Sequence, residues 1–355
     1  MDAVHEGKIR KILTAAVAAP SGDNSQPWRF VFRTPDTIEF YAIPEKDNAL
    51  LNIDESGTFI ALGAAIQNAE LEAKALGFSP EIRFGGEGAP VATLVLRDEA
   101  APSDLEQTLE RAILLRHTNR KAYKNSPLAD GDRQALINAA GEVEGARLSL
   151  LEGKEDMASV ARALTTMEEV ALQNKSLHKL FFESIFWSKE QNTAGKPGLY
   201  IKTLELPPPA QLLFKVLRYW PVATVLAKIG FPKVVAATNA KQNASASAFG
   251  VITLSRFDRL HYIEAGRLLE RVWLMAAARG MSLQIVTGLL FLARTVARGD
   301  SPLFSVEERA LVKSAYVRIR EQMSSNEPFL MFRVGYAEAP SAVSFRKPPV
   351  VTSTR

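Results

Sequence analysis

Five basic side chains gather between residues 111 and 124 with no acidic residue among them: Arg111, Arg116, Arg120, Lys121 and Lys124. The middle of this segment interleaves guanidinium groups with a histidine and a hydroxyl, in the order Arg116, His117, Thr118, Asn119, Arg120. Guanidinium groups form strong, often bidentate hydrogen bonds with phosphate, so this pattern favours one phosphate over a nucleic-acid polymer. A solvated basic loop is an equally good interpretation of the charge alone.

A second polar cluster is the segment 19–30, which reads Ala-Pro-Ser-Gly-Asp-Asn-Ser-Gln-Pro-Trp-Arg-Phe. Two prolines bound a run of short polar side chains that could bind a ligand. The same composition also fits an ordinary loop after a helix, in which Ser21 and Asn24 satisfy local backbone groups. Composition does not decide between these two interpretations.

Other kinds of site find little support. The 355 residues contain no cysteine, which excludes disulfides and thiolate metal ligands, and the four histidines form no HExxH motif, so no metal is expected. Gly85-Gly86-Glu87-Gly88 lacks the dinucleotide-binding spacing, and GxxxxGK[ST] and GxSxG are absent. The net charge of +4 is too small to indicate nucleic acid. Neither a membrane span nor a signal peptide is predicted, so we expect a cytoplasmic protein.

The elements that must position these clusters are predicted from periodicity and turn residues. In the first part we expect a helix ending near Ala19, a hairpin at 29–33 and 38–43, a helix at 56–76, strands at 81–84 and 91–96, and a helix from the Ser103 capping box to about Leu115. Later we expect helices at 131–140, 155–174, 263–279 and 306–322 and strands at 249–254 and 329–334. Proline and glycine breaks make 178–240 an irregular, lid-like insertion containing an apolar helical piece at 212–229.

An internal repeat indicates how these elements are organised. Residues 63–79 align without gaps on 266–282, and Gly, Leu, Ala, Ala, Gly and Ser recur in register. Any two buried helices that end at glycine could share small residues, but the matched spacing favours duplication. We therefore predict an α+β fold with two halves, at 1–110 and 111–355, that pair as an intramolecular pseudo-dimer with a cleft between them.

These motifs together resemble the FMN-dependent nitroreductases. That family has an arginine segment for the flavin phosphate, a PSxxNxQPW loop, a GxxxQN-type core helix and an arginine after a Gly-Tyr strand end. The counterparts here are residues 116–120, residues 20–28, the two repeated helices, and Gly335-Tyr336 followed by Arg346. The resemblance covers nearly the whole chain apart from 178–240.

The order of the motifs departs from the usual family order, in which the phosphate segment comes first. Here the first half holds the PSxxNxQPW loop and the second half holds the phosphate segment, so the halves would complement each other in one flavin site, and the other site should be lost. This arrangement resembles the fused, lid-bearing branch of the superfamily, which is dormancy-associated and Acg-like.

The resemblance implies a cofactor, a reaction and a set of site residues. FMN would take hydride at N5 from NADH or NADPH and pass electrons to an unidentified small organic acceptor, without a catalytic side chain. Arg116, Arg346 and Thr118 would bind the phosphate, Arg120 the pyrimidine edge, and the backbone of Thr287-Gly288 would face N5. The complete set of implied cofactor-binding residues is Pro20, Ser21, Gly22, Asn24, Arg116, His117, Thr118, Arg120, Thr287, Gly288 and Arg346.

Two alternatives remain open at this stage. A lid at 178–240 could close the site, which would make the protein a flavin-binding or flavin-sequestering protein with little reductase activity. The basic and apolar segment 212–229 could instead lie on a membrane surface, although we expect a lid helix that packs on the core. Apart from the pairing of its own halves, the expected partner is a small-molecule substrate, with no nucleic acid.

Overall fold

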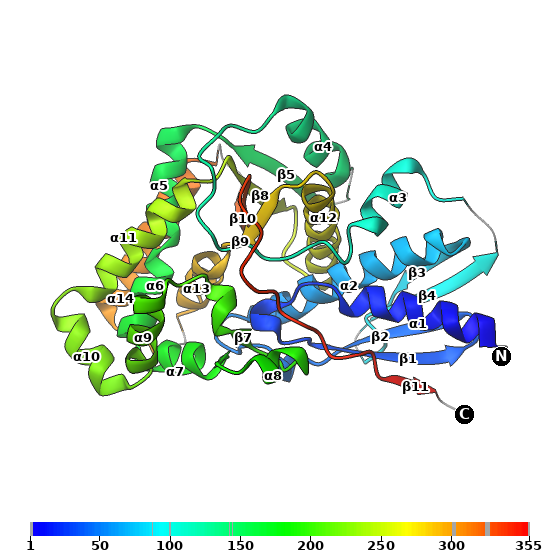
Figure 1. Cartoon of the computed structure of the whole chain (residues 1–355), viewed down its shortest axis with the longest axis horizontal. Helices are drawn as coiled ribbons and strands as arrows, with labels where there is room; N and C mark the ends of the chain where they lie inside the picture. Colours follow the sequence, from blue (N-terminus) through cyan, green and yellow to red (C-terminus); the bar gives the residue numbers. More distant parts are fainter. Residues whose placement is uncertain are drawn as a thin grey trace.

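A five-stranded and a four-stranded sheet lie on either side of a central pair of helices, α2 (Ser56–Ala75) and α12 (Arg259–Ala278), in the computed structural model (Figure 1). The structure describes residues 3–86, 88–98, 101–141, 143, 145–299, 303–323 and 327–353. Both central helices are rich in alanine and leucine, and most of their side chains are buried in one continuous apolar core. The expected α+β fold is confirmed.

The two halves share one topology. The first half contains α1 (Ala3–Val17), β1 (Trp28–Thr34), β2 (Thr37–Ala42), α2, β3 (Phe78–Phe84) and β4 (Ala92–Asp98). The second half contains α4 (Asp130–Ala140), β5 (Ala146–Leu151), β8 (Ala248–Leu254), α12, β9 (Ser282–Ile285) and β10 (Pro328–Gly335). The strand order β1-β2-β4-β3 in one sheet matches β5-β8-β10-β9 in the other, and every one of these pairings is antiparallel.

The contact between α2 and α12 is reciprocal. A Cβ atom built on Gly63 would lie 2.0 Å from the carbonyl oxygen of Ile263, and one built on Gly266 would lie 2.1 Å from the carbonyl oxygen of Ile60. Gly63 aligns with Gly266 in the internal repeat, and Ile60 and Ile263 each lie three residues before the aligned glycine. Because each helix offers the same patch to the other, the halves pair as the subunits of a two-fold dimer do, and the two glycines let the backbones touch.

The C-terminal segment joins the second half back to the first. After β10 the chain crosses the molecule, and β11 (Val351–Ser353) pairs in parallel with β1 (Figure 1). Helix α3 (Asp104–Arg111) lies in the connection that leads from β4 of the first half to α4 of the second half. It begins at a capping box formed by Ser103 and Glu106. The pseudo-dimer is therefore closed by an exchanged strand as well as by the helix contact.

Short 3-10 helices of the first half are η1 (Gly22–Asn24), η2 (Pro44–Lys46) and η3 (Ile53–Glu55), and the remaining helices occur in two connections of the second half. Between β5 and β8 lie α5 (Lys154–Leu164), α6 (Thr166–Gln173), α7 (Lys175–Glu183), β6 (Ile185–Phe186), α8 (Lys189–Thr193), β7 (Leu199–Tyr200), η4 (Ile201–Leu204), α9 (Pro208–Leu217), α10 (Trp220–Lys228) and α11 (Phe231–Ala244). Between β9 and β10 lie α13 (Gly288–Ala297) and α14 (Val306–Glu321). Most of these helices share a second apolar core.

Several sequence expectations require correction. The single helix at 155–174 is two helices, α5 and α6, which meet at Thr165. The apolar piece at 212–229 is also two helices, because the chain turns at Arg218 and Tyr219 before Pro221. The segment 178–240 is largely helical, and the helix after Ser103 ends at Arg111 instead of Leu115.

The helix contact gives a direct test of the pairing. Gly266→Ala should lower the free energy of unfolding by about 3 kcal/mol or more, because its methyl group would meet a backbone carbonyl that cannot move aside. Gly131→Ala in α4 is the matched control, since its Cβ would lie 3.6 Å from the flexible end of Arg279. Urea denaturation of both variants measures the difference, and equal stability would contradict the close approach of α2 and α12.

Candidate functional site

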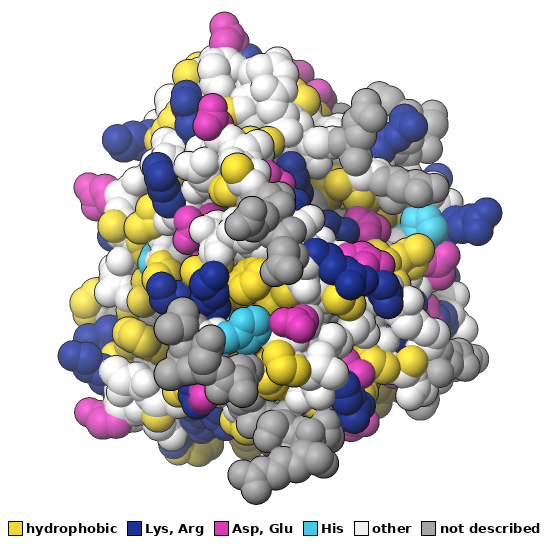
Figure 2. Space-filling view, turned by 90° about the vertical axis from the view of Figure 1, so that its right-hand side faces the viewer, with side chains coloured by type: hydrophobic (Ala, Val, Ile, Leu, Met, Phe, Trp, Pro, Cys, Tyr) yellow, Lys and Arg dark blue, Asp and Glu magenta, His cyan; other side chains and the backbone are white. Residues whose placement is uncertain are grey.

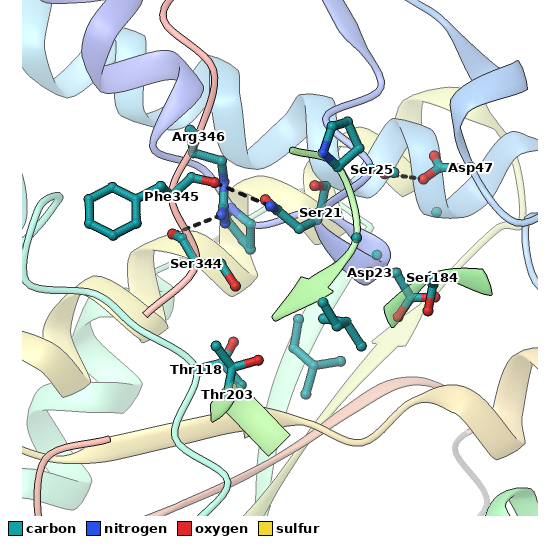
Figure 3. Close-up of a pocket in the computed structure, with 18 of the residues that line it drawn as sticks. Ser21, Asp23, Ser25, Asp47, Thr118, Ser184, Thr203, Ser344, Phe345 and Arg346 are labelled. Carbon is teal, nitrogen blue, oxygen red and sulfur yellow. Dashed lines mark hydrogen bonds between the residues drawn. The ribbon is translucent and has the colours of Figure 1, made fainter. Parts of the chain in front are cut away.

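All eleven residues of the implied site line one cavity of about 960 Å³. Figure 3 shows residues of four separate parts of the chain around this space: Ser21 and Asp23, Thr118, Ser184 and Thr203, and Ser344 and Arg346. The cavity is therefore built from the first half, the second half, the connection between β5 and β8, and the C-terminal segment. A volume of this size suits a cofactor or a drug-sized ligand.

One end of the cavity is basic. Arg116 is buried, and its Nε lies 3.1 Å from Oε1 of the fully buried Glu270. Its guanidinium also lies over the ring of Trp273 at 4.4 Å and donates a 2.7 Å hydrogen bond to the carbonyl of Ala18. Arg346 arrives from the C-terminal segment and donates to the carbonyl of Ala19 at 3.1 Å. Two arginines from distant parts of the chain thus meet beside the end of α1.

The positive charges at this end of the cavity repel one another. Burial, together with the neighbouring charge of Arg116, lowers the pKa of Arg346 to about 9. Desolvation and the charges of both arginines lower the pKa of His117. Glu270 compensates only part of this charge, and burial raises its pKa. A bound dianion would relieve the repulsion between the arginines, so the site is suited to a phosphate.

The segment 117–120 owes its position to the edge of the second sheet. Thr118 forms an isolated parallel bridge with Leu283 of β9, and the backbone N–H of Asn119 donates to the Leu283 carbonyl at 3.1 Å. The buried Asn119 side chain donates to Ser282 and to the carbonyl of Glu338. Because Asn119 anchors the segment, its neighbours Thr118 and Arg120 can line the cavity.

The polar loop of the first half has an unusual backbone. Asp23, Asn24 and Gln26 have φ values of 46°, 57° and 54°, in the left-handed region. Side-chain hydrogen bonds hold this conformation: Asn24 Nδ2 donates to the carbonyls of Lys196 and Phe345, and Gln26 Nε2 donates to that of Gly195. The Oδ1 atom of Asn24 is buried without a hydrogen-bond partner in the described part of the chain. This acceptor is available to a ligand.

Residues 184–204, which we call the strap, cross one side of the cavity. Arg120 donates to the Thr203 carbonyl at 3.0 Å, and Asn192 donates to the Val343 carbonyl at 2.9 Å. A Cβ on Gly195 would meet the carbonyl group of Arg346 at about 2.5 Å, so the strap touches the C-terminal segment directly. The strap lines the cavity, whereas α9 and α10, which stand in place of the helical piece expected at 212–229, do not.

Thr287 and Gly288 mark the start of α13. The Thr287 hydroxyl donates to the Met331 carbonyl at 2.9 Å, and Gly288 begins the helix at the cavity wall. The first N–H groups of a helix have no partner within it. The pair therefore forms a helix entry at the cavity wall, and its role toward FMN N5 stays a prediction.

A second cavity occupies positions that are equivalent in the repeat. In the register that aligns Gly63 with Gly266, its lining residues Gln67, Phe84 and Leu260 correspond to Glu270, Thr287 and Gly57. The last two of these line the first cavity, and Glu270 supports Arg116. Phe84 replaces a helix-start threonine and Gln67 replaces the acid, so the second cavity lacks these features of the first.

Sequence reasoning missed two features of the site: Glu270 supports Arg116 from α12, and Asp23 faces Arg120. The strap lies within the lid-like insertion expected at 178–240, but its individual contacts were not expected. Only Glu270 had a sequence signal, because it is an acid on the otherwise apolar face of a helix whose repeat partner has Gln67. The strap contacts join segments far apart in the chain, which periodicity does not reveal.

The buried ion pair at the basic end is testable. Glu270→Gln keeps the shape of the side chain but leaves Arg116 without its carboxylate, and should lower the free energy of unfolding by about 3–5 kcal/mol. In the matched control Glu264→Gln, Arg267 keeps Glu70 at 2.8 Å, so the loss should stay within about 1 kcal/mol. Urea unfolding without added ligand compares the two, and similar midpoints would show that Glu270 does not stabilise Arg116.

Comparison with known proteins gives relatives over most of the chain. No protein-family model matches. An uncharacterized protein of Mycobacterium tuberculosis is 25% identical over 95% of this chain, which spans 47% of that relative, or about half its length. A second M. tuberculosis relative, named "Putative NAD(P)H nitroreductase", is 25% identical over 81% of this chain and 78% of its own length.

Solved structures with weaker similarity carry related names. The FMN-dependent nitroreductase NfnB of Mycobacterium smegmatis, in complex with NADPH, is 16% identical over 66% of this chain and 90% of its own, with a TM-score of 0.35. A Bacteroides fragilis nitroreductase with bound FMN is 12% identical over 69% of this chain and 94% of its own, with a TM-score of 0.32. The resemblance to the nitroreductases that the motifs indicated is confirmed by the M. tuberculosis relative of that name.

Proposed function

We propose that this chain is a flavoprotein oxidoreductase of the nitroreductase type, which binds FMN in the 960 Å³ cavity. It would pass electrons from NADH or NADPH to a small organic acceptor. The observation that carries the proposal is the composite construction of the cavity. The strained polar loop comes from one half, and the basic segment and Arg346 come from the other, so that neither half holds a complete site.

Two groups of residues in the cavity fit FMN. Arg116, Arg346 and Thr118 would bind the phosphate, where two neighbouring guanidinium groups have only one buried carboxylate to compensate them. The unpartnered Oδ1 of Asn24 would accept a hydrogen bond from the cofactor, and Ser21 and Gly22 line the same wall. When bound, FMN supplies the group that accepts hydride from nicotinamide and releases electrons to the acceptor.

The protein's own groups would then orient the bound FMN and shield it from water. Arg120 would provide positive charge near the ring, although its guanidinium is also held by the Thr203 carbonyl. Asp23 faces Arg120, and burial raises the pKa of its carboxyl group while the charge of Arg120 opposes that rise. The strap would limit the access of water, and the start of α13 offers backbone N–H groups.

A second function is favoured by the strap contacts. Hydrogen bonds from Asn24 and Gln26 to the backbone of residues 195 and 196 tie the strap to the polar loop. A strap that stays closed would keep nicotinamide from the cofactor, and the protein would sequester flavin. We favour the reductase, because a relative that is 25% identical over 81% of this chain is named "Putative NAD(P)H nitroreductase".

Anaerobic reduction separates these functions. The purified chain, loaded with FMN, should lose its flavin absorbance when NADPH or NADH is added, and an oxidised acceptor should restore it. Bound FMN that dithionite reduces, but that neither nicotinamide reduces at any concentration, would support sequestration. A chain that does not retain FMN would contradict the proposed cofactor.

The phosphate end has its own test. Arg346→Ala should weaken FMN binding by about 1.5–3 kcal/mol, the usual worth of a hydrogen bond to a charged group, and should leave riboflavin affinity nearly unchanged. We choose Arg346 because Arg116 also compensates Glu270. Arg111→Ala, which removes a cation outside the cavity lining, is the control. Fluorescence titration gives both affinities, and equal losses for FMN and riboflavin would show that Arg346 does not meet the phosphate.

A further inference from the structure

Helices α9, α10 and α11 form a lobe at residues 208–244 whose outer surface is unusually apolar. Their described side chains include seven large apolar residues that are 38–75% exposed: Leu212, Leu213, Val216, Tyr219, Val225, Ile229 and Val234. In α9, Leu212 and Val216 are one helical turn apart, and Tyr219 lies just beyond the end of that helix. Such patches usually mark surfaces that contact a partner or a membrane.

The same lobe carries positive charge only. The sequence contains no acidic residue between Glu205 and Asp258. The lobe has five exposed cations: Lys215, Arg218, Lys228, Lys233 and Lys241. Lys215 lies near the Trp187 ring and Arg218 donates to the Tyr219 hydroxyl at 2.6 Å, so neither meets a carboxylate in the described structure. The exposed apolar side chains are thus interspersed with uncompensated cations.

The inner side of the lobe is packed against the rest of the protein. Leu217, Ala223 and Ala236 are buried, and Phe214 packs against Phe181 and Phe182 of α7. His178 Nε2 lies 2.8 Å from the carbonyl oxygen of Leu217, which fixes the end of α9. The lobe therefore packs on the protein through its inner residues, and the exposed apolar residues on its outer side take no part in that packing.

The lobe lies at one end of the molecule, and a surface that carries both acidic and basic side chains lies at the opposite end. Figure 1 shows α9 and α10 at the end of the molecule farthest from the N-terminus. Figure 2 shows the opposite end, where acidic side chains lie among the basic ones. No single described helix has the length and apolarity to cross a membrane, and the pair α10 and α11, which passes that test together, is bent by 84°.

From these observations we propose that the lobe docks on the surface of an anionic lipid membrane. Short amphipathic helices with lysine and arginine among exposed aliphatic and aromatic residues lie in the headgroup region. Cations near an anionic bilayer add electrostatic attraction. The cations and the complete lack of acidic residues favour anionic lipid over a second copy of the chain, because two such lobes would repel each other.

The test uses the intact, FMN-loaded chain and vesicle co-sedimentation. Binding should be weak on pure phosphatidylcholine and should rise at least about tenfold when roughly a third of the lipid is phosphatidylglycerol, given the attraction of several cations. Val225→Ser with Ile229→Ser should remove most binding by deleting exposed apolar contacts. Lys228→Glu with Lys233→Glu should remove the preference for phosphatidylglycerol.

A matched control keeps the result specific. Leu115→Ser with Val350→Ser removes two apolar side chains of similar exposure outside the lobe and should bind vesicles as the unaltered chain does. Circular dichroism checks that each variant is folded. No binding, or binding that is equal on both lipids and insensitive to the lobe variants, would overturn the proposal. It would also be overturned if light scattering showed a dimer that only the lobe variants dissociate.

Discussion

The close approach of α2 and α12 is the constraint on which the rest of the molecule depends. Gly63 and Gly266 bring each helix against a backbone carbonyl of the other. No larger side chain fits at these two positions, so the two sheets are held at one distance and in one orientation. The main cavity forms where the edges of the two halves meet, and its shape follows from that contact.

The cavity is built at an electrostatic cost that its surroundings only partly offset. Arg116, Arg346 and His117 share a small, partly dry volume, and Glu270 is the fully buried acid that faces them. Such an arrangement is unfavourable unless something anionic completes it. The strained loop at residues 22–26 similarly keeps an amide oxygen without a partner. A cofactor with a phosphate would compensate the positive charge, and its polar groups could donate to the amide oxygen. Both features therefore support the proposed FMN.

Part of the candidate site could be singled out from the sequence. Residue type and spacing mark the segments 20–28 and 116–120 as polar clusters, but their assignment to a flavin comes from the resemblance to the nitroreductases and stays a prediction. The internal repeat indicates that two halves meet. Strand β5 was missed, because its sequence Ala-Arg-Leu-Ser-Leu-Leu alternates only weakly, and β11 was missed because pairing with β1 alone makes it a strand. The strap lies within the insertion that the sequence marks as lid-like, but its contacts with Asn24, Gln26 and Arg346 were not predictable, since they join residues more than a hundred positions apart. The division of the chain near residue 110 stays a prediction.

The central claim is that the two halves complete a single flavin site between them. The most direct measurement is the ratio of FMN to chain in the folded, saturated protein, from absorbance after release of the flavin and from total phosphate. A ratio near one is predicted, because the second cavity has Phe84 and Gln67 where the first has features built on Thr287 and Glu270. A ratio near two would contradict the composite site, and a ratio near zero would contradict the cofactor.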